Sequence, residues 1–303
     1  MMCERVILSI ISLFLSYFPL LADNSKYGEL DIKIQCSKKY EELAKYTEST
    51  IKKSLPKICS VIGNPEDTII YILVDSEDQF RRYIGFNSPS WANGMTLFPK
   101  GIVVIKTPDL TYSTLRSFRT TIVHELVHII QGQQVPLNLT PVWFNEGLAV
   151  YLSEEYNLRS KIVLSRAITK KKLIPLDKLS DILNFSNLKA ELAYDESTSV
   201  IEYLIQVYGF GIIREIFDNM RSGRSFENSI TITTGIDYSN FSYFWGQYIS
   251  KTYRWVFLLD IQYILWLIMP LLLILAYLSI RYRNRETTKI WEDQEKDENR
   301  ISE

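Results

Sequence analysis

The sequence predicts an α+β fold in which a small sheet precedes a mostly helical part and one long apolar helix. Three observations support this prediction. Residues 28 to 106 contain short alternating or apolar segments that are typical of strands. Residues 113 to 254 have mainly helical spacing, and residues 256 to 280 form a nearly continuous apolar run.

The elements of the sheet-forming part follow one another closely. The segment "GELDIKIQC" alternates apolar and polar residues as a half-buried strand does, and "TIIYILV" is apolar enough for a buried strand. The stretch "GMTLFPKGIVVIK" divides into two short strands at Pro99, Lys100 and Gly101. Helices are expected between these strands, at residues 37 to 55 (ending near Pro56) and at residues 76 to 83.

Composition limits the classes of partner. The 303 residues suit one or two domains, and an apolar fraction of 47% is enough for a sizeable core. The formal net charge is −1, so the chain lacks the overall basic field that attracts nucleic acid. We therefore expect no nucleic-acid partner.

The N-terminal segment has the pattern of a secretory signal peptide. Arg5 precedes an apolar run that Pro19 interrupts before the small residue Ala22. We expect a signal peptide at residues 1–22, and the alternative is an uncleaved membrane anchor.

The C-terminal apolar run predicts a membrane-spanning helix at residues 256–280. Twenty uncharged residues, from Ile261 to Ile280, are enough to cross a hydrocarbon core of about 30 Å. Three arginines follow at once in "RYRNR", and basic residues on that flank predict a cytoplasmic tail at residues 281–303. The polar end of that tail is expected to be disordered. Residues 23–255 would then form an extracytoplasmic domain held at the membrane.

An exported domain changes what the cysteines can do. Cys36 and Cys59 lie outside the predicted leader. An oxidising compartment permits a disulfide between them, and two free buried thiols are the alternative.

The segment "TTIVHELVHIIQGQ" contains both histidines of the chain, His124 and His128. Residues four apart share one face of a helix, so the two imidazoles project side by side. The stretch fits H-E-x-x-H, in which two histidines bind zinc and the intervening glutamate, here Glu125, serves as general base. The alternative is a pair of ordinary histidines on a buried helix.

A third ligand is expected because a catalytic zinc takes three protein ligands and leaves one position open. No histidine remains to supply it. In "PVWFNEGLAVYLSEEY" a helix that begins near Pro141 would carry Glu146, a carboxylate placed among aromatic and aliphatic residues. Glu154 and Glu155 are expected at a solvated helix end.

These two segments, "HELVH" and "WFNEGLAVYL", resemble the gluzincin metallopeptidases and above all the peptidase MA-like group. The resemblance implies a thermolysin-like catalytic domain with an N-terminal mixed sheet, zinc-site helices and a helical C-terminal part. It implies Zn²⁺ as the cofactor, with His124, His128 and Glu146 as ligands and Glu125 as the catalytic base.

The resemblance extends more loosely over residues 28 to 250. It includes "AYDESTSVIEYLIQVYG", where it implies Tyr194 as the donor to the carbonyl oxygen, and "GMTLFPKGIVVI", a strand that would line the substrate cleft. Tyr194 as a packing tyrosine is the alternative. Thr96 stands where aminopeptidases carry a glutamate for the substrate's amino terminus. Val150 stands where thermolysin-like relatives carry an aspartate that supports a zinc-bound histidine, so another group must do this here.

The leading hypothesis is therefore a membrane-anchored zinc peptidase, an endopeptidase acting on peptides or proteins outside the cytoplasm. Glu125 would accept a proton from water bound to zinc and pass it to the leaving amine. Two alternatives remain: an inactive metallopeptidase-like interaction module at the membrane, and an envelope-structural protein in which the motif is a coincidence.

Overall fold

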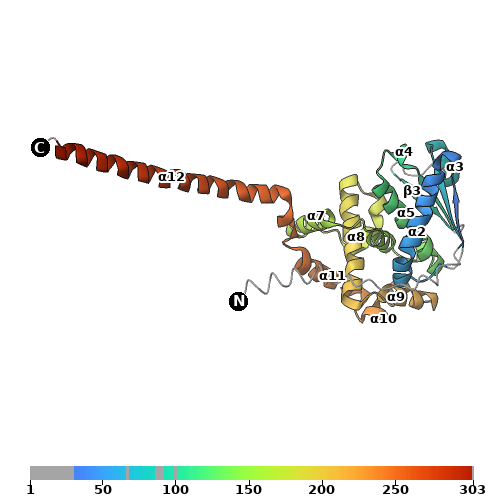
Figure 1. Ribbon diagram of the computed structural model, residues 1–303. Helices are drawn as coiled ribbons and strands as arrows, with labels where there is room; N and C mark the ends of the chain where they lie inside the picture. Colours follow the sequence, from blue (N-terminus) through green and yellow to red (C-terminus); the bar gives the residue numbers. More distant parts are fainter. Residues whose placement is uncertain (1–30, 66–67, 86–91, 99–100, 302–303) are drawn as a thin grey trace. The chain divides into compact units, whose positions relative to one another are not determined.

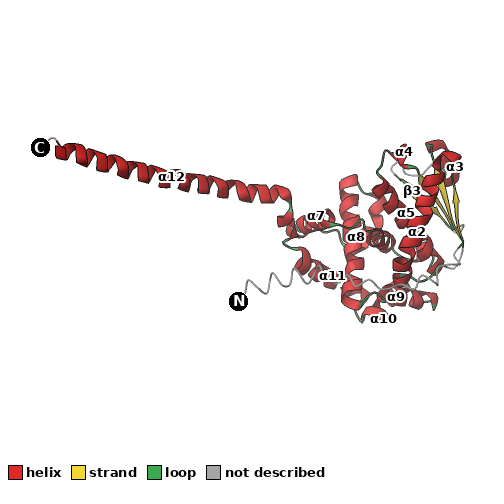
Figure 2. Ribbon diagram, in the orientation of Figure 1, coloured by secondary structure: helices red, strands yellow, loops and turns green. Residues whose placement is uncertain are grey.

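The computed structural model describes residues 31–65, 68–85, 92–98 and 101–301 (Figure 1). The chain forms two compact units, one of Met1–Tyr156 with Ile174–Trp245, the other of Asn157–Leu173 with Gly246–Glu303. The predicted signal peptide, residues 1–22, lies outside the described residues. The fold is mostly helical with a small mixed sheet, in agreement with the predicted α+β class (Figure 2).

The first unit contains a four-stranded sheet of order β1-β2-β4-β3. Strands β1, β2 and β4 are parallel to one another, and β3 pairs antiparallel with β4 at the edge. The predicted strands are confirmed in the described residues, at β1 (Ile32–Gln35), β2 (Ile69–Val74), β3 (Gly94–Leu97) and β4 (Ile102–Lys106).

The two faces of the sheet pack against different helices. On one face Ile72, Val104 and their neighbours form an apolar cluster with Phe80 of α3 (Glu77–Ile84). On the other face the Tyr71 hydroxyl donates a hydrogen bond of 2.8 Å to the carbonyl of Ile122 in α5 (Leu115–Gln134). Because side chains alternate along a strand, Gly94 and Thr96 of β3 lie on this α5 side.

Helix α2 (Glu41–Val61) links β1 to β2 and runs beside α5 (Figure 1). The prediction that this helix ends near Pro56 is wrong. Proline removes one backbone donor from the helix, but Ile58 and Cys59 beyond it are fully buried, and this packing keeps the chain helical. Cys36 and Cys59 are free thiols, and burial raises the pKa of Cys59 to about 11.

Helices α6 (Val142–Ser153) and α8 (Asn187–Tyr208) pack closely in the first unit. A Cβ atom on Gly147 would lie 2.5 Å from the backbone oxygen of Ser197, so only glycine permits this approach. The other helices and turns of this unit are α4 (Pro108–Thr111), α9 (Ile212–Arg221) and α10 (Phe226–Thr234), the first half of α11 (Tyr238–Tyr253), and the 3₁₀ turns Lys38–Tyr40, Leu137–Leu139 and Leu176–Asn184.

The second unit joins α7 (Leu158–Thr169) to the C-terminal segment. The buried Ser165 hydroxyl accepts the backbone N–H of Phe257 at 2.9 Å, and Arg166 pairs with Asp260. After the 3₁₀ turn η5 (Val256–Leu259), α12 (Ile261–Ile301) contains one candidate membrane span, Ile264–Glu292, whose apolar window is not buried in protein. The predicted disorder of the polar tail is wrong, since α12 continues through it. Glu, Lys, Arg and Gln are good helix formers, and they are frequent there.

The close packing at Gly147 makes a testable prediction. Gly147→Ala should lower the free energy of unfolding by about 1–3 kcal/mol, because the new methyl group forces α6 away from α8. Gly246→Ala is the matched control: no atom lies within 4 Å of its Cβ position in helix α11, so alanine should stabilise by about 0.5–1 kcal/mol. Chemical denaturation of the detergent-solubilised full chain measures both. Equal effects of the two substitutions would contradict the close approach.

Candidate metal centre

Helix α5 presents the two histidines on one side. Its N-cap, Thr114, accepts the backbone N–H of Ser117 at 3.1 Å, which satisfies one of the free donors of the first turn. His128 is buried and His124 nearly so. Their apolar neighbours hold the helix in the core: Ile122, Val123, Leu126, Val127, Ile129 and Ile130 are all buried.

Three possible ligand atoms converge from α5 and α6. His124 Nε2 lies 3.2 Å from His128 Nε2 and 3.5 Å from Glu146 Oε2. The other carboxylate oxygen, Glu146 Oε1, lies 3.8 Å from His128 Nε2. A tetrahedral zinc with bonds of about 2.0–2.1 Å separates its ligand atoms by about 3.3–3.4 Å. The three side chains therefore lie close enough together to hold a zinc ion, and the structure brings together the three residues that the sequence selected.

The protonation of these residues is tightly coupled. Burial by itself lowers the pKa of His124, but its hydrogen bonds with Glu146 and Glu155 outweigh burial and raise that pKa well above the ordinary value. Burial lowers the pKa of His128. Burial opposes ionisation of Glu146 too, yet the hydrogen bond with His124 holds its pKa below the usual range. The hydrogen bond with His124 thus favours the anionic form of this carboxylate.

Glu155 is a site residue that the sequence did not reveal. The expectation of a solvated helix end holds for Glu154, which is exposed and pairs with Lys57 and Arg119. It is wrong for Glu155, whose Oε1 lies 3.3 Å from His124 Nδ1. Helix α6 ends at Ser153 and Glu154 adopts a left-handed conformation (φ 65°), which turns the chain back toward the histidine.

Glu125 lies beside the ligands, in contact with the edge strand β3. The Thr96 hydroxyl donates a hydrogen bond of 2.7 Å to Glu125 Oε2. A Cβ atom on Gly94 would lie 3.0 Å from Glu125 Cγ, so a larger residue there would press on the carboxylate side chain. Two residues of β3 thus fix the position of Glu125, which is only 7% exposed.

Tyr194 lies on α8, within the electrostatic influence of the same carboxylates. Burial raises the pKa of its hydroxyl, and Glu146, Glu155 and Glu125 raise it further. The phenol therefore keeps its proton at neutral pH and is available as a hydrogen-bond donor.

A buried polar network joins α5 to α6 next to the ligands. Gln131 Nε2 donates to Asn145 Oδ1 at 2.5 Å, and Asn145 Nδ2 donates to the carbonyl of Leu137 at 3.0 Å. These bonds connect the turn after His128 to the residue before Glu146. Asn145 is therefore a residue that sets the spacing of the two helices.

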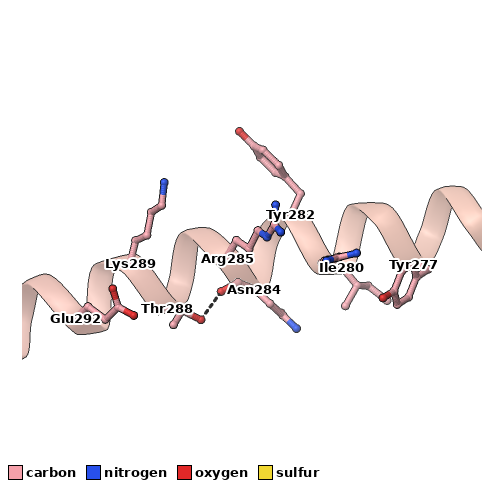
Figure 3. Close-up of a pocket in the computed structure, with 9 residues that line it drawn as sticks. Tyr277, Ile280, Tyr282, Asn284, Arg285, Thr288, Lys289 and Glu292 are labelled. Atoms are coloured by element: carbon pink, nitrogen blue, oxygen red, sulfur yellow. Dashed lines mark hydrogen bonds between the residues drawn. The ribbon is translucent and has the colours of Figure 1, made fainter.

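Two other features do not form part of this site. Glu196 is fully buried on α8, and burial raises its pKa to about 8, but both its oxygens accept the backbone N–H of Ile174. A shallow concave surface on α12 is lined by residues of that one helix, and Figure 3 shows their side chains diverging from it. A single helix cannot enclose a ligand.

A mixed sheet beside a helix with two histidines, facing a glutamate from the next long helix, defines a metallopeptidase-like domain. The Peptidase MA superfamily matches residues 51–251, about two thirds of the 303 residues, and the chain belongs to this superfamily. The matched region contains α5, α6 and α8 and therefore the whole candidate metal centre. No curated protein matches the chain significantly.

The converging ligands make a prediction about metal content. The purified full chain should bind one zinc per chain, and Glu146→Ala should weaken binding by more than about 100-fold, since it removes a direct ligand. Glu42→Ala, which removes an exposed carboxylate on α2, should leave binding unchanged. Elemental analysis and competition with a chelator measure this. Undiminished zinc affinity in the Glu146 variant would exclude the three-ligand site.

Proposed function

We propose that this chain is a membrane-anchored zinc-dependent endopeptidase of the gluzincin type, with a thermolysin-like arrangement of its catalytic domain. The observation that carries the proposal is the convergence of His124, His128 and Glu146 next to a fixed Glu125. Membership of the Peptidase MA superfamily supports it. A ligand set of two histidines and one glutamate leaves a coordination position open, as catalytic zinc sites require.

The chain's own residues divide the chemistry between them. A zinc ion held by the three ligands supplies a Lewis acid that acidifies water and polarises a carbonyl. Glu125 accepts the proton of the attacking water and returns it to the leaving amine. Thr96 orients Glu125 through its hydrogen bond, so that the carboxylate meets the water in one position.

Tyr194 is the proposed donor to the carbonyl oxygen as negative charge develops on it. It is protonated, partly buried and under the influence of the site's carboxylates, and no third histidine exists in the chain to take this role. A preorganised donor of this kind contributes about 3–4 kcal/mol to catalysis.

The edge strand β3 favours an endopeptidase. It is the last strand in the sheet order, and among the described residues no strand pairs with its outer edge, which suits an extended peptide. Thr96 carries no charge, and its hydroxyl is already bonded to Glu125. An aminopeptidase needs an acidic group for the substrate's amino terminus, and this position does not supply one.

The membrane anchor in this proposal is α12. Its apolar segment is exposed and long enough to span, and Arg281, Arg283 and Arg285 follow the most apolar part. The catalytic domain would then face the extracytoplasmic side, where its peptide or protein substrates are met.

The catalytic assignment is tested with Glu125→Gln and Tyr194→Phe. Neither residue is a metal ligand, so both variants should retain one zinc per chain. Glu125→Gln should lower the rate of peptide hydrolysis by at least about 10²-fold and Tyr194→Phe by about 10²–10³-fold. The zinc-loaded full chain is incubated with a quenched-fluorescence peptide library, and the products are identified by mass spectrometry. Cleavage that is the same in wild type and Glu125→Gln would refute the peptidase proposal.

The orientation in the membrane is tested with a C-terminal epitope tag. In inside-out vesicles trypsin should remove the tag, and in right-side-out vesicles the tag should be protected, because the arginines hold the tail in the cytoplasm. Replacing Arg281, Arg283 and Arg285 by Asn is the control, and it should reduce the fraction with this orientation. Protection in inside-out vesicles only would reverse the proposed topology.

A further inference from the structure

We propose that Glu155 is a positioning residue for the metal centre, which holds the ring of His124 in the orientation and tautomer that a metal requires. The inference rests on the proposed function, since it concerns the same site. Glu155 belongs neither to the H-E-x-x-H segment nor to the helical turn that follows Glu146, and we assign to it the support of the ligand His124.

The geometry of the contact points to this role. Glu155 Oε1 lies 3.3 Å from His124 Nδ1, whereas His124 Nε2 faces His128 and Glu146. When Nδ1 carries the proton and donates it to Glu155, Nε2 keeps its lone pair for a metal. Carboxylates that accept the outer N–H of a metal-bound histidine fix its orientation and raise its basicity.

The turn that delivers Glu155 is held from several sides. Glu154 adopts the left-handed conformation, which is uncommon for a residue other than glycine. Its carboxylate lies 3.0 Å from Lys57 Nζ on α2 and 3.6 Å from Arg119 on α5. The Ser153 hydroxyl donates a hydrogen bond of 2.8 Å to Glu155 Oε1. These contacts of Ser153 and Glu154 therefore hold Glu155 in its position beside His124.

The two histidines differ in whether a carboxylate contacts the Nδ1 atom of the ring. His128 Nδ1 is buried and has no hydrogen-bond partner in the part of the chain that the structure describes. Val150, one helical turn after Glu146, carries no polar group that could support either ring. Glu155 thus supplies a carboxylate to one ring, and that ring is the one nearest to Glu146.

The test compares Glu155→Ala and Glu155→Gln with Glu42→Ala, which removes an exposed carboxylate on α2. Zinc affinity of the full chain should fall by about 10–100-fold in Glu155→Ala. It should fall less in Glu155→Gln, whose amide oxygen can still accept the hydrogen bond. Glu42→Ala should stay within about threefold of wild type, because its ion pair with Lys45 is exposed and such pairs contribute little.

A spectroscopic readout separates positioning from general stability. The chain contains only two histidines, so with ¹⁵N-histidine labelling every imidazole signal belongs to His124 or His128. Glu155→Ala should shift one of the two ring N–H signals of the zinc-loaded protein and leave the other in place. A purely structural role would disturb both rings, and it would also lower the unfolding temperature of the metal-free protein.

Failure of the positioning role can be distinguished from failure of the proposed zinc peptidase function. If wild type binds zinc, and both Glu155 variants match Glu42→Ala in zinc affinity and in both ring signals, the positioning role is overturned while the zinc site stands. If wild type itself binds no zinc, the proposed function fails and this inference fails with it.

Discussion

A concentration of buried negative charge is the constraint on which this site depends. Glu125, Glu146 and Glu155 lie around two imidazoles, and burial opposes the ionisation of Glu146 and Glu155 while their hydrogen bonds with His124 hold the pKa of both below the usual range. The ligand group itself consists of two imidazoles and a carboxylate, His124, His128 and Glu146. A divalent cation between the three ligand atoms would balance the charge that the fold has placed there.

Such a site needs helices that approach closely and stay in register. Gly147 allows α6 to contact the backbone of α8 at Ser197. The ligand Glu146 is the residue next to Gly147 on α6, so this contact also fixes its position. On the other side, Gln131 and Asn145 join α6 to α5 through a short hydrogen bond. Packing against α8 and polar bonding to α5 thus fix the two ligand-bearing helices independently, so the ligand atoms can converge without help from a flexible loop.

The parts of this arrangement that are local in sequence could be predicted. His124 and His128 share a helix face because of the four-residue spacing, and the strands alternate with a period of two. Glu155 could not be found in this way. Its position depends on a left-handed residue that is not glycine, and on ion pairs of Glu154 with residues far away in the chain. The helical course through Pro56 was missed for the same reason, since tertiary burial overrides a local signal.

The way in which β3 restricts the Glu125 side chain favours a hydrolase over an inactive interaction module. A module that only held a metal would need its three ligands, and Glu125 is not one of them. Even so, β3 provides both a hydroxyl that bonds to this carboxylate and a glycine that leaves it room. Restricting a buried carboxylate costs conformational entropy and desolvation, which a purely structural site has no reason to incur. A general base, by contrast, works only when its oxygen is held within hydrogen-bonding reach of the attacking water.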